Sequence, residues 1–211
     1  MVINEIRQIP LLSEINTDIL DRCIAKNQLF VSHYSKDATV HHQHEACVAL
    51  DIVLSGRLVA YSLSENGSVI TMFEFQQNSI IGANLLFGEN PNYPLNIYSI
   101  AACDLLHLSK AAVMEFLHNH NFVIGYIKSL SLNSQGMNRK ITMLTQKTLR
   151  ENLMDYLKQQ SIIQGTTKIV LPFSKKELAD YMGVQRPSLF RELKKLKDEG
   201  IIKISNRTIQ L

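Results

Sequence analysis

Two short amphipathic segments joined at a glycine, within Leu171–Leu211, constrain the fold more than any other part of the sequence. Ser174 precedes the first segment and Glu177 follows three residues later, which is the spacing of a helix capping box. Gly183 suits the left-handed turn that ends this helix, and Pro187 suits the first turn of a second helix. The side chains that would face inward are Leu178, Ala179 and Met182, then Leu189, Leu193 and Leu196. The pattern predicts a helix-turn-helix, and a solvated pair of amphipathic helices is the alternative.

The outward side of the second predicted helix is polar and basic. It carries Gln185, Arg186, Ser188, Arg191, Lys194 and Lys195. Residues 146–211 hold 13 Lys and Arg against 7 Asp and Glu, a net charge of +6, whereas residues 1–145 hold 9 against 12, a net charge of −3. This asymmetry indicates a polyanion as the partner of the C-terminal third, although solvated basic faces are also common. Two short runs at 201–204 and 208–211, with a polar tip between them, predict a wing.

The segment from 29 to 108 consists of short β-branched runs separated by turn residues. Asn66-Gly67, between two such runs, is the strongest hairpin signal in the chain, and Ser55-Gly56 separates two others. Strands spaced this closely predict an antiparallel barrel or roll, preceded by an amphipathic helix at 13–27. A further helix is predicted to begin after Ser109.

A helix predicted from about 122 to 145 carries a regular apolar row. Its members recur at spacings of three and four, which forms a heptad seam with one polar residue: Ile127, Leu130, Ser134, Met137, Ile141 and Leu144. We expect this row to be a dimer interface, and packing of the helix on its own roll is the alternative. Another helix is predicted at 148–163, with a domain boundary near residue 146.

The composition is that of a globular protein, since 45% of the residues are hydrophobic and 19% are charged. Cys23, Cys47 and Cys103 are isolated, which favours a reducing compartment over a disulfide framework. We expect a cytoplasmic protein without a membrane partner, because the sequence has no signal-peptide pattern and no apolar run of spanning length. The absence of a P-loop, a GxGxxG motif and a paired nucleophile signature argues against an enzyme.

A β-roll, a long helix and a winged helix-turn-helix, in this order, resemble the CRP/FNR superfamily of bacterial transcription regulators. The matching motifs are Leu54-Ser55-Gly56-Arg57-Leu58, Ile80-Ile81-Gly82, Leu85-Leu86-Phe87, Ser174-Lys175-Lys176-Glu177-Leu178-Ala179, Arg186-Pro187-Ser188-Leu189 and Arg191-Glu192-Leu193. The resemblance implies an α+β fold with an N-terminal antiparallel, jelly-roll-like β-roll sensor domain at 1–120. A dimerisation helix at 121–145 and a winged helix-turn-helix at 146–211 would follow. It also implies a homodimer on a palindromic site in double-stranded DNA, with RNA polymerase as a further partner if the protein is an activator.

The resemblance assigns roles within the helix-turn-helix. Arg186 and Arg191 match two arginines that contact bases and phosphates in the family, which suits the chemistry of the guanidinium group. Lys175 matches a phosphate contact. The other expected DNA contacts are Gln185, Ser188, Lys194 and Lys195. Pro187 stands where some members carry a glutamate that accepts from cytosine, so the half-site of those members is not expected here.

The effector region departs from the cyclic-nucleotide-binding members of the family. Those members have Gly-Glu at the start of a phosphate-binding segment and Arg-Ser or Arg-Thr about ten residues later. Here Gly82 is followed by Ala83, and Tyr93-Pro94 stands in place of the arginine pair. The phosphate would lose its cation and the ribose its acceptor, so we expect no dependence on cyclic AMP. We expect no cofactor, and an unknown small-molecule effector remains open.

Three histidines precede Cys47 in the predicted roll: His41, His42 and His44. On a strand, His42 and His44 would point to one side and His41 to the other. Such side chains could bind a transition metal or haem, but a third ligand at a defined spacing is missing. We therefore assign no metal, and a polar β-turn that is rich in histidine is the favoured explanation.

Two alternatives stay open beside the leading hypothesis of a DNA-binding regulator. The chain could be a small-ligand sensor whose basic C-terminal domain serves a protein partner. Arg57 or Lys128, from a different strand or helix, could bind a cyclic phosphate in place of the missing arginine.

Overall fold

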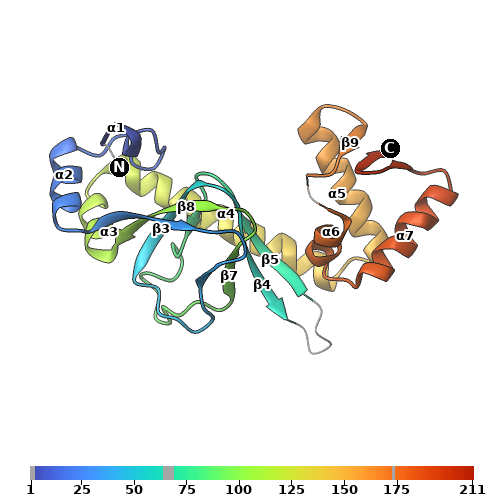
Figure 1. Cartoon of the computed structure of the whole chain (residues 1–211), viewed down its shortest axis with the longest axis horizontal. Helices are drawn as coiled ribbons and strands as arrows, with labels where there is room; N and C mark the ends of the chain where they lie inside the picture. Colours follow the sequence, from blue (N-terminus) through green and yellow to red (C-terminus); the bar gives the residue numbers. More distant parts are fainter. Residues whose placement is uncertain (1–2, 64–68, 173) are drawn as a thin grey trace. The chain divides into compact units, whose positions relative to one another are not determined.

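The computed structural model describes residues 3–63, 69–172 and 174–211 (Figure 1). These residues form two compact units. The first unit combines Met1–Tyr61 with Phe73–Gly136, and the second combines Ser62–Met72 with Met137–Leu211. The hairpin turn predicted at Asn66-Gly67 lies outside the described residues.

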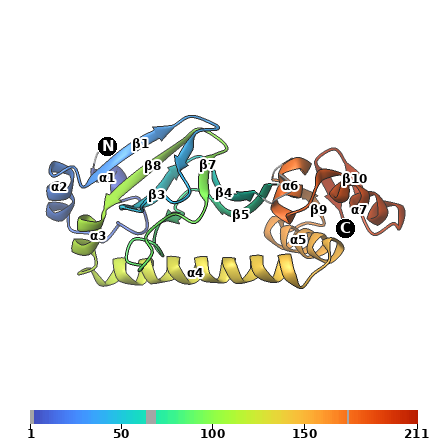
Figure 2. The same ribbon diagram turned by 90° about the horizontal axis from the view of Figure 1, so that it is seen from below.

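The strands predicted between 29 and 108 are present and form two four-stranded sheets in the described residues (Figure 2). They are β1 (Leu29–Tyr34), β2 (Thr39–His41), β3 (Ala49–Ser55), β4 (Leu58–Leu63), β5 (Val69–Phe75), β6 (Ile80–Ile81), β7 (Asn96–Ser99) and β8 (Cys103–Ser109). One sheet has the order β1-β8-β3-β6 and the other the order β2-β7-β4-β5, and the described registers are antiparallel. Gly56 makes the turn from β3 to β4 at a φ of 83°, where a Cβ would lie 2.3 Å from the carbonyl oxygen of Ala102.

Helices α1 (Ile3–Ile6), α2 (Thr17–Ala25) and α3 (Lys110–Phe116) belong to the first unit. α2 is shorter than the predicted 13–27 segment because Asn16 caps it, accepting a hydrogen bond from the backbone N–H of Asp18. Ser109 caps α3 as predicted. The largest fully buried side chains of this core include Leu20, Leu50, Ile52, Leu58, Leu105, Leu106, Leu108, Phe116 and Phe122.

The predicted long helix is α4 (His120–Thr145), whose 26 residues extend from the first unit into the second. Among the described ranges, no helix is long and apolar enough to cross a membrane.

The second unit contains the predicted helix-turn-helix and wing. Its remaining elements are α5 (Leu149–Gln164), β9 (Lys168–Val170), α6 (Lys175–Met182), α7 (Arg186–Asp198), β10 (Lys203–Ser205) and β11 (Thr208–Gln210). The three strands pair antiparallel in the order β10-β11-β9. Leu178, Leu189 and Ile209, from α6, α7 and β11, are fully buried in one core. These elements, with the two sheets and α4, confirm the predicted α+β fold class.

Candidate nucleic-acid interface and effector region

The turn of the helix-turn-helix is fixed by the signals that predicted it. Ser174 and Glu177 form a reciprocal capping box at the start of α6, with the backbone N–H of Ser174 donating to Glu177 Oε2 at 2.6 Å. Gly183 ends α6 in the left-handed conformation, at a φ of 69°. A Cβ there would lie 2.9 Å from Leu144 Cδ2, the end of a flexible side chain, so the left-handed conformation is the main reason for glycine.

α7 divides into a buried apolar side and an exposed polar side. Its buried side chains are Leu189, Leu193 and Leu196. The exposed residues include most of the expected DNA contacts, namely Gln185, Arg186, Arg191, Lys194 and Lys195, whereas Ser188 and Lys175 are half-buried. The seven expected contacts therefore lie on α7, at its N-cap Gln185 and at the first residue of α6.

The charges on α7 are ordered by short contacts. Arg191 Nη2 donates to Ser188 Oγ at 3.2 Å, and the guanidinium of Arg186 lies 5.3 Å from the ring centre of Phe190. Acidic Glu199 is held by both Nη atoms of Arg150 in α5, and Glu192 forms an ion pair with the same arginine at 3.6 Å. Glu192 also pairs with Lys195 at 3.9 Å, so the two carboxylates are neutralised while Arg186 and Arg191 stay exposed.

The apolar row of α4 is largely exposed. Ile127 is 51% exposed and Ile141 is 50% exposed. Leu144 and Ser134 are also exposed, while Met137 is half-buried. Leu130 packs partly against the core of the first unit, so this residue serves the roll as well as the row.

The effector region is filled by side chains of the roll itself. Tyr93 is 2% exposed and stacks on His41, with ring centres 4.1 Å apart and planes 14° apart. Burial, followed by the nearby charge of Asp51, raises the pKa of Tyr93 far above its ordinary value, so the phenol stays neutral. Ala83 is buried and its carbonyl accepts from Tyr126 Oη at 2.6 Å. The positions that would meet a phosphate and a ribose thus present an aromatic ring and a methyl group.

Of the two candidates for an alternative phosphate contact, Arg57 is paired with a carboxylate and Lys128 is exposed. Arg57 forms an ion pair with Glu74 at 3.6 Å, and Lys128 is exposed on α4. Gly82 and Pro94, the other residues of the expected effector region, are buried and exposed, respectively.

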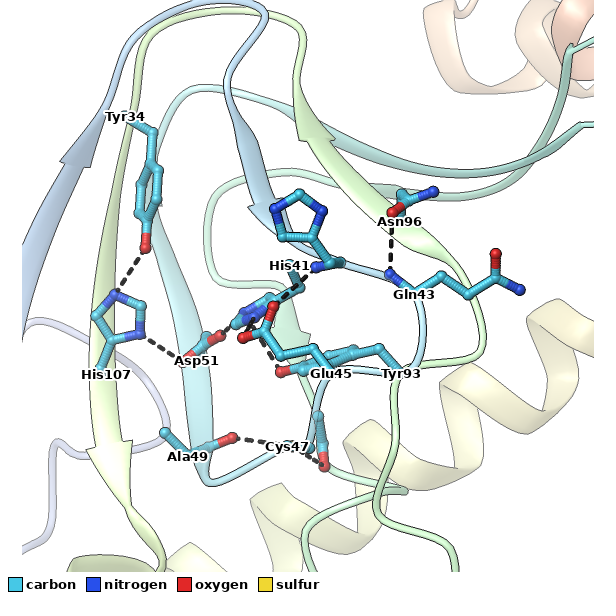
Figure 3. Close-up of polar contacts among 12 residues, drawn as sticks. Tyr34, His41, Gln43, Glu45, Cys47, Ala49, Asp51, Tyr93, Asn96 and His107 are labelled. Atoms are coloured by element: carbon cyan, nitrogen blue, oxygen red, sulfur yellow. Dashed lines mark hydrogen bonds and ion pairs between the residues drawn. The ribbon is translucent and has the colours of Figure 1, made fainter.

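A buried carboxylate that the sequence analysis missed lies beside Tyr93 (Figure 3). Asp51 is fully buried between two histidines, with Oδ2 at 2.6 Å from His41 Nε2 and Oδ1 at 2.7 Å from His107 Nδ1. Burial alone would raise the pKa of Asp51, but the hydrogen bonds from His107 and His41 outweigh it and hold the pKa below its ordinary value. Its signal in the sequence is an acidic residue inside an otherwise apolar strand, matched by a histidine in β8.

His41 is separated from His42 and His44 as predicted, but the separation does not come from alternation along one strand. β2 ends at His41, and His42 and His44 lie in the following turn, where His44 adopts a φ of 69°. The turn forms because the carboxylate of Glu45 accepts from the backbone N–H of His42 at 2.9 Å. His41 therefore points into the roll while His42 and His44 are exposed. Throughout the described part of the chain, no three His, Cys, Asp or Glu side chains are grouped as a metal site requires.

Comparison with known proteins places both units. The cyclic nucleotide-binding domain family matches residues 31–120, and the Crp-like helix-turn-helix domain family matches residues 149–211. The cAMP-activated global transcriptional regulator CRP of Salmonella typhimurium is 21% identical over 196 residues, which cover 85% of this chain and 90% of that protein. The protein of the same name from Haemophilus influenzae is 19% identical over 83% of this chain and 81% of its own length.

Solved structures share the fold of the whole chain. A CooA mutant from Carboxydothermus hydrogenoformans has a TM-score of 0.76 at 19% identity, covering 96% of this chain and 90% of that chain. The c-di-GMP responsive global regulator CLP of Xanthomonas campestris has a TM-score of 0.74 at 18% identity, covering 93% of this chain and 99% of that chain. With the two domain families matched in the same order, the chain belongs to the CRP/FNR superfamily of transcription regulators.

Proposed function

We propose that the chain is a sequence-specific transcription regulator that binds a palindromic operator in double-stranded DNA as a homodimer. The observation that carries the proposal is the outer face of α7, where Arg186 and Arg191 are exposed and the nearby carboxylates are turned toward Arg150. A helix of this kind fits the major groove, and a guanidinium can donate two hydrogen bonds to guanine O6 and N7. Lys175, Lys194 and Lys195 would contribute phosphate contacts. An activator would in addition contact RNA polymerase.

The proposed dimer interface is the apolar row of α4. Ile127 and Ile141 keep about half of their surface in water, which is unfavourable for apolar side chains. α4 of a second copy would cover them by heptad packing. We assign residues 1–120 to a sensor roll, 121–145 to dimerisation and 146–211 to DNA binding. Two copies would present their α7 helices to successive major grooves, about 34 Å apart, which requires a two-fold symmetric site.

We also propose that DNA binding does not depend on cyclic AMP. A cyclic phosphate transferred into a roll needs a fixed cation and donors to replace its hydration. Tyr93 offers one neutral hydroxyl, which already lies 3.3 Å from His41 Nε2, and Ala83 offers no side-chain acceptor to a ribose. The chain would therefore bind its operator without this ligand, in contrast to the relatives whose names describe them as cAMP-activated.

Selection of binding sites from random double-stranded DNA by the full-length chain, without any added ligand, tests the function. We expect enrichment of a two-fold symmetric sequence and a dissociation constant that rises steeply with salt, because neutralised phosphates release counterions. A selected pool that stays random would overturn sequence-specific binding. Enrichment that appears only after cyclic AMP is added would overturn ligand independence alone.

A further inference from the structure

Phe190 is an exposed aromatic residue on the helix proposed to enter the major groove. Phe190 is 39% exposed, whereas the three leucines on the buried side of α7 are 3% exposed or less. The buried side chains of α7 are Leu189, Leu193 and Leu196, and Phe190 is not one of them. A large apolar group that stays partly in water on a basic surface is a candidate for contact with a partner.

The helical geometry places Phe190 among the proposed base contacts. At about 100° per residue, Phe190 lies about 40° from Arg186 and about 60° from Pro187 around the axis of α7. Along the axis, Phe190 is about 6 Å from Arg186, which corresponds to one or two base-pair steps. Phe190 would therefore meet the base pair next to, or one beyond, the pair contacted by Arg186.

Two cations are organised around the ring of Phe190. Arg186 Cζ lies 5.3 Å from the ring centre, and Lys175 Nζ, from the first residue of α6, lies 5.8 Å from it. Both distances are within the range of cation–π attraction. The partly exposed ring of Phe190 therefore lies within cation–π range of two proposed DNA contacts.

The neighbouring residues limit which base Phe190 can contact. Pro187 has no side-chain acceptor for the amino group of cytosine or adenine, and it has no N–H to donate to a base. Glu192 is turned toward Arg150 and its side chain is 14% exposed. The group in the major groove that favours an apolar side chain is the C5-methyl group of thymine.

We propose that Phe190 is a specificity-determining residue that contacts the C5-methyl group of one thymine in each half-site, beside the base contacted by Arg186. This inference rests on the proposed function and adds the identity of one base. Burial of the methyl group against the ring would favour thymine over any base that presents no methyl group there. Arg186 would supply the hydrogen bonds and Phe190 the apolar contact.

Replacement of thymidine by deoxyuridine tests the contact, because the two nucleosides differ only by the C5-methyl group of the base. The operator selected by the full-length chain is synthesised with deoxyuridine at each thymine in turn, and affinity is measured by fluorescence anisotropy. We expect one symmetric thymine position at which the change weakens binding about fourfold in one half-site and roughly 15-fold in both. In Phe190→Ala this difference should vanish, whereas Lys194→Ala should weaken both operators and keep their ratio.

Three results would overturn the inference or its basis. If the unchanged chain binds every deoxyuridine operator as tightly as the thymine operator, the methyl contact does not exist, and this arm needs no variant to fold. If Phe190→Ala keeps the full preference for thymine, another residue contacts the methyl group. If the chain selects no sequence at all, the proposed function itself fails, which is distinct from a selected operator that is insensitive to deoxyuridine.

Discussion

The Nδ1 atom of His107 lies 2.7 Å from Oδ1 of Asp51, a carboxylate that is fully buried. Its other oxygen is bound by His41 at 2.6 Å. Asp51 and His107 stand on neighbouring strands of one sheet, β3 and β8, whereas His41 ends β2 in the other sheet. A buried carboxylate requires partners that replace its hydration, so this network also links the two sheets of the roll.

Asp51→Asn should destabilise the roll by about 2–4 kcal/mol. The amide is nearly the same size as the carboxylate, but it loses the negative charge that two histidines compensate. Urea unfolding followed by circular dichroism measures the change. Gln43→Ala, at an exposed position of the same turn, is the matched control and should leave the free energy of unfolding within about 0.5 kcal/mol of the original.

Stability should fall as the pH rises through the titration of His41. Burial alone would lower the pKa of His41, but its hydrogen bonds to Asp51 and Glu45 raise the pKa above the ordinary value. A raised folded-state pKa gives stability that is complete below the unfolded pKa of about 6.5 and is lost as the pH rises through the folded-state value. The pKa of Asp51 is lowered in the folded state, so its effect on stability runs in the opposite direction. The stability that it contributes is lost as the pH falls below about 4.

The measurement is urea unfolding at a series of pH values. The groups that face His41 are Asp51, Glu45 and Tyr93, and the first two favour its charged form. We expect the greatest stability between about pH 4 and 6.5, and a decline above it that disappears in His41→Gln. His42→Gln, at an exposed position, should keep the decline. A profile that is flat above pH 6.5 in the unchanged chain would contradict the assignment.

Met137→Glu should convert the proposed dimer to monomers, because a carboxylate would be buried in the apolar row of α4. Operator affinity should fall with it, since two copies of α7 would no longer be held together. Sedimentation velocity measures the oligomeric state. Gln135→Glu introduces the same charge on an exposed part of α4 away from the row, and it should leave the dimer intact. A dimeric Met137→Glu variant would place the interface elsewhere.

Arg191→Ala should cost about 1–3 kcal/mol on the operator and relax the preference at one base position. Ser188 Oγ holds this guanidinium at 3.2 Å, so the group is partly organised before DNA binds. Lys194→Ala should weaken operator and random DNA alike, as expected of a phosphate contact. Anisotropy titrations on both DNAs measure the two losses. An equal loss on both DNAs for Arg191→Ala would show that it contacts only the backbone.

Cyclic AMP and cyclic GMP should not bind with micromolar affinity. The missing cation and the missing ribose acceptor would each cost on the order of 2–5 kcal/mol, which moves a micromolar site beyond the millimolar range. Titration calorimetry checks this, with the cAMP-activated regulator of Salmonella typhimurium as the positive control. A micromolar dissociation constant for either nucleotide would refute the expectation.

The parts of the fold that the sequence predicted depend on interactions within a few residues. Ser174 and Glu177 are three residues apart, and their capping box is visible without any knowledge of the tertiary structure. Gly183 and Gly56 carry the same kind of local information, because their positive φ values restrict the residue type. For this reason the helix-turn-helix and the turn between β3 and β4 were predictable.

The features that the sequence did not predict depend on the register between distant strands. Asp51 and His107 face each other only because β3 and β8 pair antiparallel with Asp51 opposite His107. Whether His42 continues β2 depended on the side chain of Glu45, which accepts its N–H and forms a turn. Phe190 was visible in the sequence as an apolar residue in α7, but only the packing of Leu189, Leu193 and Leu196 shows that the core does not bury it.

Tyr93 stacked on His41 has a consequence for what such a regulator can respond to. An occupant that is part of the chain is present once per molecule under every condition, and its amount does not follow the concentration of a metabolite. If the dimer binds DNA in this state, the remaining variable is the number of copies in the cell. While the protein is mostly monomeric, operator occupancy by a dimer rises with the square of that number. The amount of protein synthesised would then be the signal that the promoter receives.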